Sequence, residues 1–210
     1  MSDVKRPSKR TQKAQETRRR ILQAALELFV GDGYGATNLQ DVADRAGVAV
    51  QTIYFVFGNK RALLKELVDV TIAGDDAPVA TMERPWYTGA LAAETADDML
   101  RAYVTGATAV LERVAPIGKM LEAAAASDPE VSALWSFDVN PRYVVQRHAA
   151  EALAGKPGAR AGLAVDEAAD VLFGLLSPEL YLLFVHERGW SRERWEQWAR
   201  ATLHAQLCQT

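Results

Sequence analysis

Gln51 and Thr52 have the side chains whose chemistry is easiest to interpret, because they lie in a short predicted helix just after Gly47. The amide of a glutamine can form two hydrogen bonds with the edge of an adenine, and a threonine can contact a thymine methyl group or a phosphate. Val50 and Phe55 belong to the same helix and could pack on thymine methyl groups or, alternatively, in a protein core. This combination predicts a helix that reads bases in the major groove of DNA.

Three predicted helices must hold these side chains in place. Apolar residues recur at helical spacing over about 12–31, and a run of glycines beginning at Gly31 ends this first helix. A short helix over about 38–46 follows, Gly47 permits a tight turn, and the next short helix covers about 50–57. Helix, glycine turn and helix predict a helix-turn-helix, in which the first short helix braces the second against the groove.

Capping patterns mark where two of the helices begin. In Thr37-Asn38-Leu39-Gln40, the Thr37 hydroxyl can accept a hydrogen bond from the backbone of Gln40, whose side chain can accept one in return from the Thr37 N–H. Asn59 predicts the start of a longer helix that contains Lys60 and extends over about 59–74.

Charge is unevenly distributed along the chain. The net charge is −3, yet residues 1–74 hold 12 of the 24 lysines and arginines and only 8 of the 27 acidic residues. Eight of these cations, including Arg18, precede Ile21. A basic end on an acidic body predicts one surface that binds a polyanion, although a solvated tail explains the same charges. We expect a disordered basic arm over residues 1–12.

Patterns for catalysis or metal binding are missing from the sequence. His148, His186 and His204 do not have the spacing of metal ligands, and neither a nucleophile elbow nor a cofactor fingerprint occurs. The glycines of 31–35 lack the preceding strand and the following Lys-Ser/Thr of a phosphate-binding loop. We therefore expect no enzyme, no cofactor and no metal; an enzyme with a helical binding domain is the weaker alternative.

Three features bear on the cellular compartment. A single cysteine, Cys208, cannot form an internal disulfide, which favours a reducing cytosol. The polar N-terminus lacks the apolar segment of a secretory signal. The longest apolar run, over 171–185, is interrupted by Ser177, Pro178 and Glu179, so we expect no membrane span. The sequence therefore predicts a cytoplasmic protein.

Four stretches in the N-terminal third follow one another at a characteristic spacing. They are TRRRILQAALELF (17–29), GYGAT (33–37), DVADRAGV (41–48) and TIYFVFGNKRALL (52–64). Together they resemble the tetracycline-repressor (TetR) family of bacterial transcriptional regulators over about residues 12–70. The resemblance implies a DNA-binding domain over 13–58, a connecting helix over 59–74, and a variable helical domain over 75–210 that binds a ligand and dimerises.

The resemblance also implies roles for single residues. Tyr54 and Lys60 match a tyrosine and a lysine that commonly hold phosphates in this family; a half-buried core ring and a solvated surface lysine are the alternatives. Thr37 could both cap its helix and touch a phosphate. The complete predicted DNA-binding set is Arg18, Thr37, Gln51, Thr52, Tyr54, Phe55 and Lys60.

The sequence departs from the family on the reading helix itself. Family members usually carry a capping Ser or Thr at the position of Ala49, and often a polar or basic residue at those of Val50, Phe55 and Val56. A reading face without cations keeps a second hypothesis open, in which the chain is a helical protein-interaction module with degenerate DNA binding.

The C-terminal two thirds is predicted to be helical throughout, which makes the fold class all-α. After an irregular connection over about 74–89, the expected helices cover about 93–113, 117–126, 129–154, 166–186 and 191–208. The last two are apolar enough to form a four-helix interface with a second copy, as the family resemblance also implies; an intrachain core is the alternative. A homodimer suits a palindromic operator. Ser177-Pro178 should kink the penultimate helix.

Aromatic and sulfur-containing residues recur in the middle of this second domain and predict a pocket between helices. We expect a small-molecule effector that is apolar or aromatic, although each residue could instead serve only the core. The predicted ligand contacts are Tyr103, Met120, Trp135, Phe137, His148, Phe173 and Tyr181. The sequence thus predicts a DNA-binding regulator, a repressor that such an effector releases from a palindromic operator.

Overall fold

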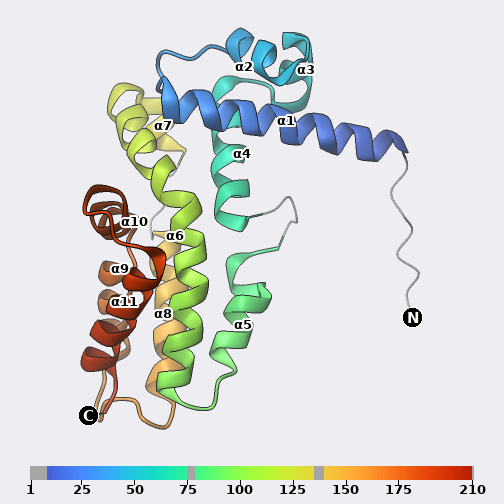
Figure 1. Cartoon of the computed structure of the whole chain (residues 1–210). Helices are drawn as coiled ribbons and strands as arrows, with labels where there is room; N and C mark the ends of the chain where they lie inside the picture. The colour runs from blue at the N-terminus through green and yellow to red at the C-terminus, as the bar shows by residue number, and fades with distance from the viewer. Residues whose placement is uncertain (1–8, 75–78, 135–139, 210) are drawn as a thin grey trace. The chain divides into compact units, whose positions relative to one another are not determined.

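The computed structural model describes residues 9–74, 79–134 and 140–209, and all regular elements within them are helical (Figure 1). The all-α prediction is therefore confirmed. Clustering of contacts divides the chain into two compact units. The first comprises Met1–Asp69 and Lys119–Leu134, and the second comprises Val70–Gly118 and Trp135–Thr210.

The first unit contains the predicted helix-turn-helix. Its elements are α1 (Lys9–Gly31), α2 (Leu39–Ala46), α3 (Val50–Phe57), the first part of α4 (Lys60–Ala73), the last turns of α6 and α7 (Pro129–Ala133). Its core is formed by apolar residues from one side of each helix, namely Ile21, Ala25, Phe29, Val42, Ala43, Ile53, Leu63, Leu64 and Leu67. The helical periodicity of these residues is what the sequence predicted for this region.

α1 begins earlier than expected. Residues 9–11 are helical although they were predicted to belong to a disordered arm, and residues 1–8 of that arm lie outside the described residues. Lys9, Arg10 and Lys13 are good helix formers, so a polar and basic composition does not by itself prevent a helix from continuing.

The start of α2 differs from the prediction by one residue. Asn38, not Thr37, is the N-cap: its side chain accepts from the backbone N–H groups of Gln40 (2.8 Å) and Asp41 (3.0 Å), and Asp41 accepts from the Asn38 N–H (2.8 Å). The capping box therefore uses Asn38 and Asp41. At the other end of α2, Gly47 has the left-handed backbone (φ 65°) that closes the turn before α3.

The second unit is a bundle of helices. It contains the end of α4, a 3₁₀ turn (Thr81–Glu83), α5 (Pro85–Leu91), most of α6 (Ala96–Ser127), α8 (Pro141–Ala154), α9 (Val165–Leu175), α10 (Pro178–Tyr181), a π-helical turn (Leu182–Glu187) and α11 (Arg192–Leu207). Its buried core includes Tyr87, Leu100, Tyr103, Leu172, Tyr181 and Trp195.

Three of the helix boundaries expected in the C-terminal two thirds of the chain were wrong. α6 continues through Pro116, because the flanking Ala115 and Ile117 are buried and their packing outweighs one lost backbone hydrogen bond. The helix expected over 129–154 is two helices, since α7 ends at Ala133 and Asn140 caps α8. The connection expected to be irregular contains α5, which begins at Pro85, a favourable first position.

The Ser177-Pro178 step interrupts the penultimate helix, as predicted, but as a complete break. α9 ends at Leu175, and the Ser177 hydroxyl accepts a hydrogen bond from the Leu180 N–H to start α10. The stretch Val165–Glu187 across this break has a mean hydropathy of 1.6 in its most apolar window, and only 33% of that window is buried. By length and composition alone it could cross a membrane, so the expectation that it is too short and polar was wrong.

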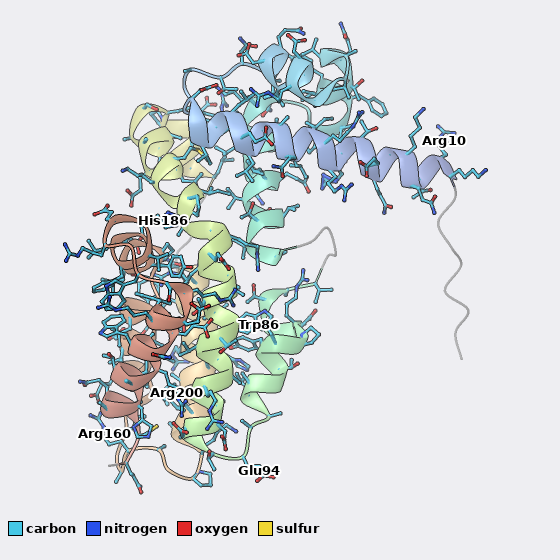
Figure 2. The ribbon with its side chains drawn as sticks, viewed as in Figure 1. Arg10, Trp86, Glu94, Arg160, His186 and Arg200 are labelled. Carbon is cyan, nitrogen blue, oxygen red and sulfur yellow. The ribbon has the colours of Figure 1, made fainter. Side chains whose placement is uncertain are left out.

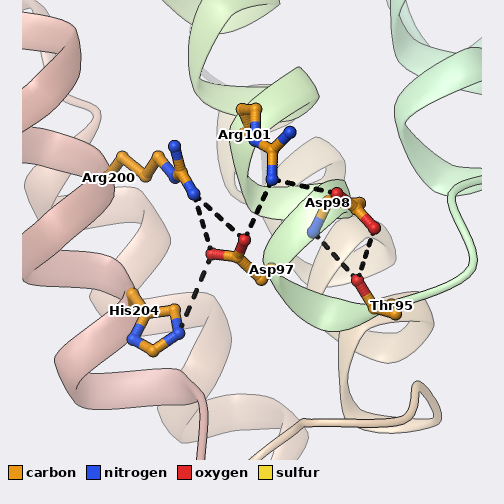
Figure 3. A network of polar contacts seen from close by, with 6 residues as sticks. All are labelled: Thr95, Asp97, Asp98, Arg101, Arg200 and His204. Carbon is orange, nitrogen blue, oxygen red and sulfur yellow. Dashed lines mark hydrogen bonds and ion pairs between the residues drawn. The ribbon is translucent and has the colours of Figure 1, made fainter.

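A polar network joins the start of α6 to α11 (Figure 3). Asp97 accepts hydrogen bonds from Arg200 (3.0 Å) and Arg101 (3.2 Å), and its carboxylate is 3.7 Å from Nε2 of His204. These ion pairs lower the pKa of Asp97, against the opposing effect of its partial desolvation. The pairs are exposed, so they contribute little energy but fix the two helices in register.

Candidate nucleic-acid interface and effector cavity

α3 separates its side chains into a buried side and an exposed side. Ile53 and Phe57 are buried in the core of the first unit and hold the helix in place. On the remaining surface, Gln51 is exposed, Thr52 is half-buried and Tyr54 is 54% exposed. The side chains predicted to read bases therefore project away from the core, and Tyr54 is not the half-buried core ring of the alternative interpretation.

Phe55 is the most exposed large apolar side chain among the described residues, at 91%. Val56 beside it is also exposed, and Val50 is half-buried. Core packing, one of the two interpretations of Phe55, is thus excluded. An aromatic ring held in solvent on a short helix is available for apolar contact with a thymine methyl group.

Three of the predicted DNA contacts make intrachain interactions instead. The Thr37 hydroxyl is buried (4% exposed) and donates to the carbonyls of Leu28 (3.3 Å) and Gly33 (3.0 Å), so it joins the end of α1 to the turn. The prediction that Thr37 touches phosphate was wrong, because its side chain points inward. Arg18 forms an ion pair with Glu66 and lies 5.4 Å from the centre of the Phe57 ring.

Lys60 also has an intrachain partner. Its ammonium group donates to the backbone carbonyl of Tyr34 and lies 4.1 Å from the centre of the Tyr34 ring. Burial lowers the pKa of Lys60 despite the opposing effect of Asp128 and Asp41. Lys60 is therefore not a solvated surface lysine, and a contact with phosphate would require it to leave the Tyr34 ring.

Unpaired cations lie on α1 instead. Lys9, Arg10, Lys13 and Arg20 are exposed and have no acidic partner within the described part of the chain. Arg10 projects from the N-terminal end of the helix (Figure 2). A row of free cations on one helix supplies the sequence-independent attraction that a polyanion requires.

The second unit contains a cavity of about 210 Å³ between α5, α6 and α8. Most of its lining is apolar, and Arg142, Gln146, Tyr103 and Thr81 are the polar members; the apolar side chains include Ile72, Trp86, Val110, Leu111, Val145 and Leu176. Trp86 extends from α5 toward α6, where its ring lies 5.9 Å from that of Tyr103 (Figure 2).

Of the predicted ligand contacts that lie among the described residues, only Tyr103 lines this cavity. Tyr181 is buried in the aromatic core against Trp195, and Met120 belongs to the first unit. Phe173 packs on Tyr143, and the guanidinium of Arg142 lies over its ring. Arg142 lines the cavity and Phe173 does not. The structure does not bring these three residues to the cavity, because aromatic and soft residues fill the core as readily as they line a pocket.

His148 was predicted to be the polar group of the pocket and is not. It is exposed, stacks on Tyr87 and shares a 2.9 Å hydrogen bond between its Nδ1 and the Tyr87 hydroxyl. Trp135 and Phe137, the remaining predicted contacts, lie outside the described residues.

Residues 21–67 match the family model for bacterial regulatory proteins of the tetR family. These residues are the end of α1, the whole of α2 and α3, and the first half of α4, so the match contains the complete helix-turn-helix. The helix-turn-helix domain of this chain is thus similar to that of the TetR family.

Curated relatives match only part of the chain. The chain is 43% identical over 58 residues to the transcriptional regulator TtgR of Pseudomonas putida, a match that covers 28% of either chain. It is 41% identical over 63 residues to AcrR of Shigella flexneri, covering 30% of this chain and 29% of that protein. The aligned stretch thus spans less than a third of these relatives.

Solved structures extend the similarity to the fold of nearly the whole chain. FadR of Bacillus subtilis, solved in complex with stearoyl-CoA, superposes with a TM-score of 0.65 at 18% identity, over 89% of this chain and 97% of FadR. A proposed transcriptional regulator from Saccharomonospora viridis, solved with choline, gives 0.67 at 18% identity, over 93% of this chain and 100% of that one. At these identities the match shows the fold alone, a TetR domain followed by a helical domain.

Sequence reasoning missed Arg142 and Gln146, two of the polar groups of the cavity in the second unit. Arg142 and Gln146 are spaced by four residues in α8 and therefore share one side of that helix. The spacing alone carries no signal, because polar pairs four residues apart are common on exposed helix surfaces. Trp86 is one aromatic residue among many in the sequence, and its position there does not predict that it lines a cavity.

Proposed function

We propose that this chain is a DNA-binding transcriptional regulator that acts as a homodimer in the cytoplasm and represses transcription until a small apolar or aromatic effector releases it from a palindromic operator. The observation that carries the proposal is the exposed side of α3, where Gln51, Tyr54 and Phe55 project from a helix whose other side is fixed in the core. A helix held in this way can enter the major groove without rearrangement.

The TetR-family relatives support the same function. Each matched curated protein is described as a transcriptional regulator, and the match contains both helices of the helix-turn-helix. Bound stearoyl-CoA and choline in two proteins of the same fold support a ligand site in the helical domain. The free cations of α1 disfavour the alternative of a protein-interaction module with degenerate DNA binding.

A second copy is the partner that best fits the apolar surface around α9, α10 and α11. Apolar side chains that are partly buried or exposed occur in and between these elements, namely Val171, Leu175, Leu183, Phe184, Trp190 and Trp198. Only 33% of the most apolar window is buried within one chain, which is low for a core segment. An isologous contact between two copies would cover this surface and set two recognition helices at half-site spacing.

DNA binding can be tested with fluorescence anisotropy, using the DNA upstream of the protein's own gene and unlabelled nonspecific DNA as competitor. Replacing Gln51 by Ala should weaken specific binding by about fivefold to over a hundredfold, since a bidentate base contact is worth roughly 1–3 kcal/mol. Gln206→Ala on α11, which is also an exposed helical glutamine, should leave the affinity unchanged. No specific binding by the wild type, or equal binding by Gln51→Ala, would contradict the proposal.

Dimerisation can be tested by light scattering after size-exclusion chromatography without detergent. Leu183→Glu should convert a dimer into a monomer, because it places a charge in the proposed interface. Val30→Glu is the matched control, since Val30 on α1 is also 40% exposed but lies in the first unit. A wild type that is monomeric at micromolar concentration, or that requires detergent to remain in solution, would reject the homodimer.

A further inference from the structure

Arg142 places a positive charge in the otherwise apolar cavity of the second unit. It lies in the first turn of α8, half-buried, with its guanidinium 3.5 Å from the centre of the Phe173 ring. Burial lowers the pKa of this arginine, but an arginine stays protonated in proteins, so the charge persists. None of the described residues that line the cavity is acidic, and Glu179, whose charge acts on Arg142 from outside that lining, forms no ion pair with it among the described residues.

Only part of the Arg142 guanidinium is occupied by the protein. Nη1 donates to the carbonyl of Phe173 at 2.7 Å and approaches that of Leu176 at 3.5 Å. Nε and Nη2 have no hydrogen-bond partner among the described residues. These two nitrogens form one edge of the planar fork, which is the edge that binds both oxygens of a carboxylate.

Gln146 adds a second donor on the same side of α8. Its side chain is buried, and its Oε1 accepts a 2.9 Å hydrogen bond from the Tyr103 hydroxyl. This bond fixes the amide so that Nε2 is the atom left to donate, and Nε2 has no partner within the described part of the chain. Arg142 and Gln146 therefore offer an unfilled set of donors, while the cavity offers no free acid to fill it.

We propose that this cavity binds a small apolar carboxylic acid in its ionised form, with the carboxylate on the free edge of Arg142 and on Gln146, and the apolar part among Trp86, Val110 and Leu111. The inference rests on the proposed function, because it specifies the chemistry of the effector. A volume of about 210 Å³ is below the roughly 300–1,000 Å³ of sites for drug-sized ligands, so the acid has a short chain or a single ring.

Other ligand chemistries fit the cavity less well. A cation would be repelled by Arg142, and a neutral apolar molecule would desolvate the free guanidinium edge without supplying an acceptor. A carboxylate accepts hydrogen bonds from that edge, and the positive charge of Arg142 balances its negative charge. Arg142 also holds the carbonyl of Phe173 near the end of α9, and α9 contributes Val171 and Leu175 to the proposed dimer surface, so the anion would act on an element of that surface.

The test is isothermal titration calorimetry of the full-length protein with ligands that share one apolar part. Octanoate, octanamide and octylamine each contain eight carbons and differ in the head group at one end, and phenylacetate with phenylacetamide repeats the comparison for a ring. In at least one series the carboxylate should bind about tenfold or more tightly than its amide, as expected for hydrogen bonds to a charged group. The series that binds identifies a chain or a ring as the apolar part.

Two variants locate the effect. Arg142→Gln should reduce the affinity for the preferred carboxylate to about that of its amide, while the affinity for the amide changes little. Arg101→Gln, an exposed arginine of the same unit with two acidic neighbours, should retain the preference. If Arg142→Gln does not fold, which circular dichroism would show, the comparison of head groups on the wild type still decides the proposal.

Equal affinities for carboxylate and amide in both series, tightest binding of octylamine, or no binding of any probe at millimolar concentration would each overturn the inference. Because the titration contains no DNA, it is independent of the proposed regulation. A protein that prefers the carboxylate but fails to bind its upstream DNA refutes the regulatory function alone. One that binds DNA but shows no such preference refutes the effector class alone.

Discussion

A phenylalanine ring that is 91% exposed on a short helix gains almost nothing from folding, since hydrophobic stabilisation is proportional to the apolar area removed from water. Phe55 is in this position on α3, between the exposed Tyr54 and Val56. The nearby Phe57 belongs to the same helix but is buried. Phe55 is therefore available for contact at the surface of α3, whereas Phe57, two residues later, stabilises the core.

We expect Phe55→Ala to change the free energy of unfolding by less than about 0.5 kcal/mol, as is usual for exposed positions, while reducing the affinity for operator DNA. Phe57→Ala should instead cost about 3–5 kcal/mol, because it leaves a cavity in the core of the first unit. Urea unfolding followed by circular dichroism measures the first quantity, and anisotropy measures the second. A marked loss of stability in Phe55→Ala with unchanged DNA affinity would show that the ring is a structural residue.

At the scale of the element, α3 begins without a side-chain cap. Ala49 has the extended backbone of an N-cap (φ −72°, ψ 141°) but no side chain that could accept from the first N–H groups of the helix. α2, directly before it, has a complete capping box. The helix that carries the exposed aromatic residues is therefore the less well capped of the two.

Ala49→Ser should stabilise the chain by about 0.5–2 kcal/mol, since a serine at this position can accept a hydrogen bond from the second or third N–H of α3. Ala49→Val, which changes the side chain without supplying an acceptor, should bring no such gain. The denaturation midpoint of the three proteins compares these outcomes. A stability of Ala49→Ser equal to or below that of the valine variant would mean that the start of α3 cannot accept a cap.

Two helical glycines make opposite predictions. A Cβ atom at Gly106 in α6 would lie 2.1 Å from the Trp86 ring, whereas one at Gly174 in α9 would meet nothing within 4 Å. Gly106→Ala should cost about 1–3 kcal/mol and displace Trp86 from the cavity wall, because the ring packs directly on the helix backbone. Gly174→Ala should stabilise by about 0.5–1 kcal/mol through helix propensity. Thermal unfolding of both variants measures these changes in stability. If both substitutions stabilise the protein, or both destabilise it, this prediction is wrong.

The periodicity of apolar residues predicted which helices exist, whereas the breaks between helices depended on packing. Pro116 is a helix-breaking signal in the sequence, yet α6 passes through it because its neighbours are buried. Asn38 and Thr37 are both good capping residues, and the inward hydrogen bonds of Thr37 leave the cap to Asn38. Such choices between adjacent candidates depend on tertiary contacts that a local pattern does not contain.

The candidate sites show the same limit. The exposure of Gln51 and Tyr54 follows from the helical spacing of Ile53 and Phe57, so the sequence was sufficient to predict it. The cavity was not predictable in this way. Arg142 is its charged group, and the position of Arg142 is fixed by a contact between the start of α8 and the end of α9. That contact brings together residues more than thirty positions apart in the chain.

At the scale of the whole molecule, most of the ionisable groups whose pKa is raised by burial are tyrosine hydroxyls. Desolvation raises the pKa of Tyr87, Tyr103 and Tyr181 above the ordinary value of 10.0, and burial also raises the pKa of the Cys208 thiol. All four belong to the second unit. Lys60 in the first unit has the opposite shift, since burial lowers its pKa.

The sign of the resulting pH dependence follows from proton binding in the two states. Above about pH 10 the unfolded tyrosines lose their protons while the folded ones keep them, so the folded state binds more protons and its stability falls as pH rises. Lys60 contributes a rise in stability above its lowered pKa, but it is one group against five phenols and a thiol, since the pKa values of Tyr34 and Tyr143 are raised as well. We expect the free energy of unfolding in urea to fall steadily between about pH 9 and about pH 11.

Tyr103→Phe should be less stable than the wild type at about pH 8, because it lacks the hydrogen bond to Gln146. Its free energy of unfolding should fall less between about pH 8 and about pH 11, because it has one fewer buried phenol to ionise. A wild-type stability that is constant or rising across this range, or an equal fall in Tyr103→Phe, would show that these phenols ionise as readily in the folded protein as in the unfolded chain.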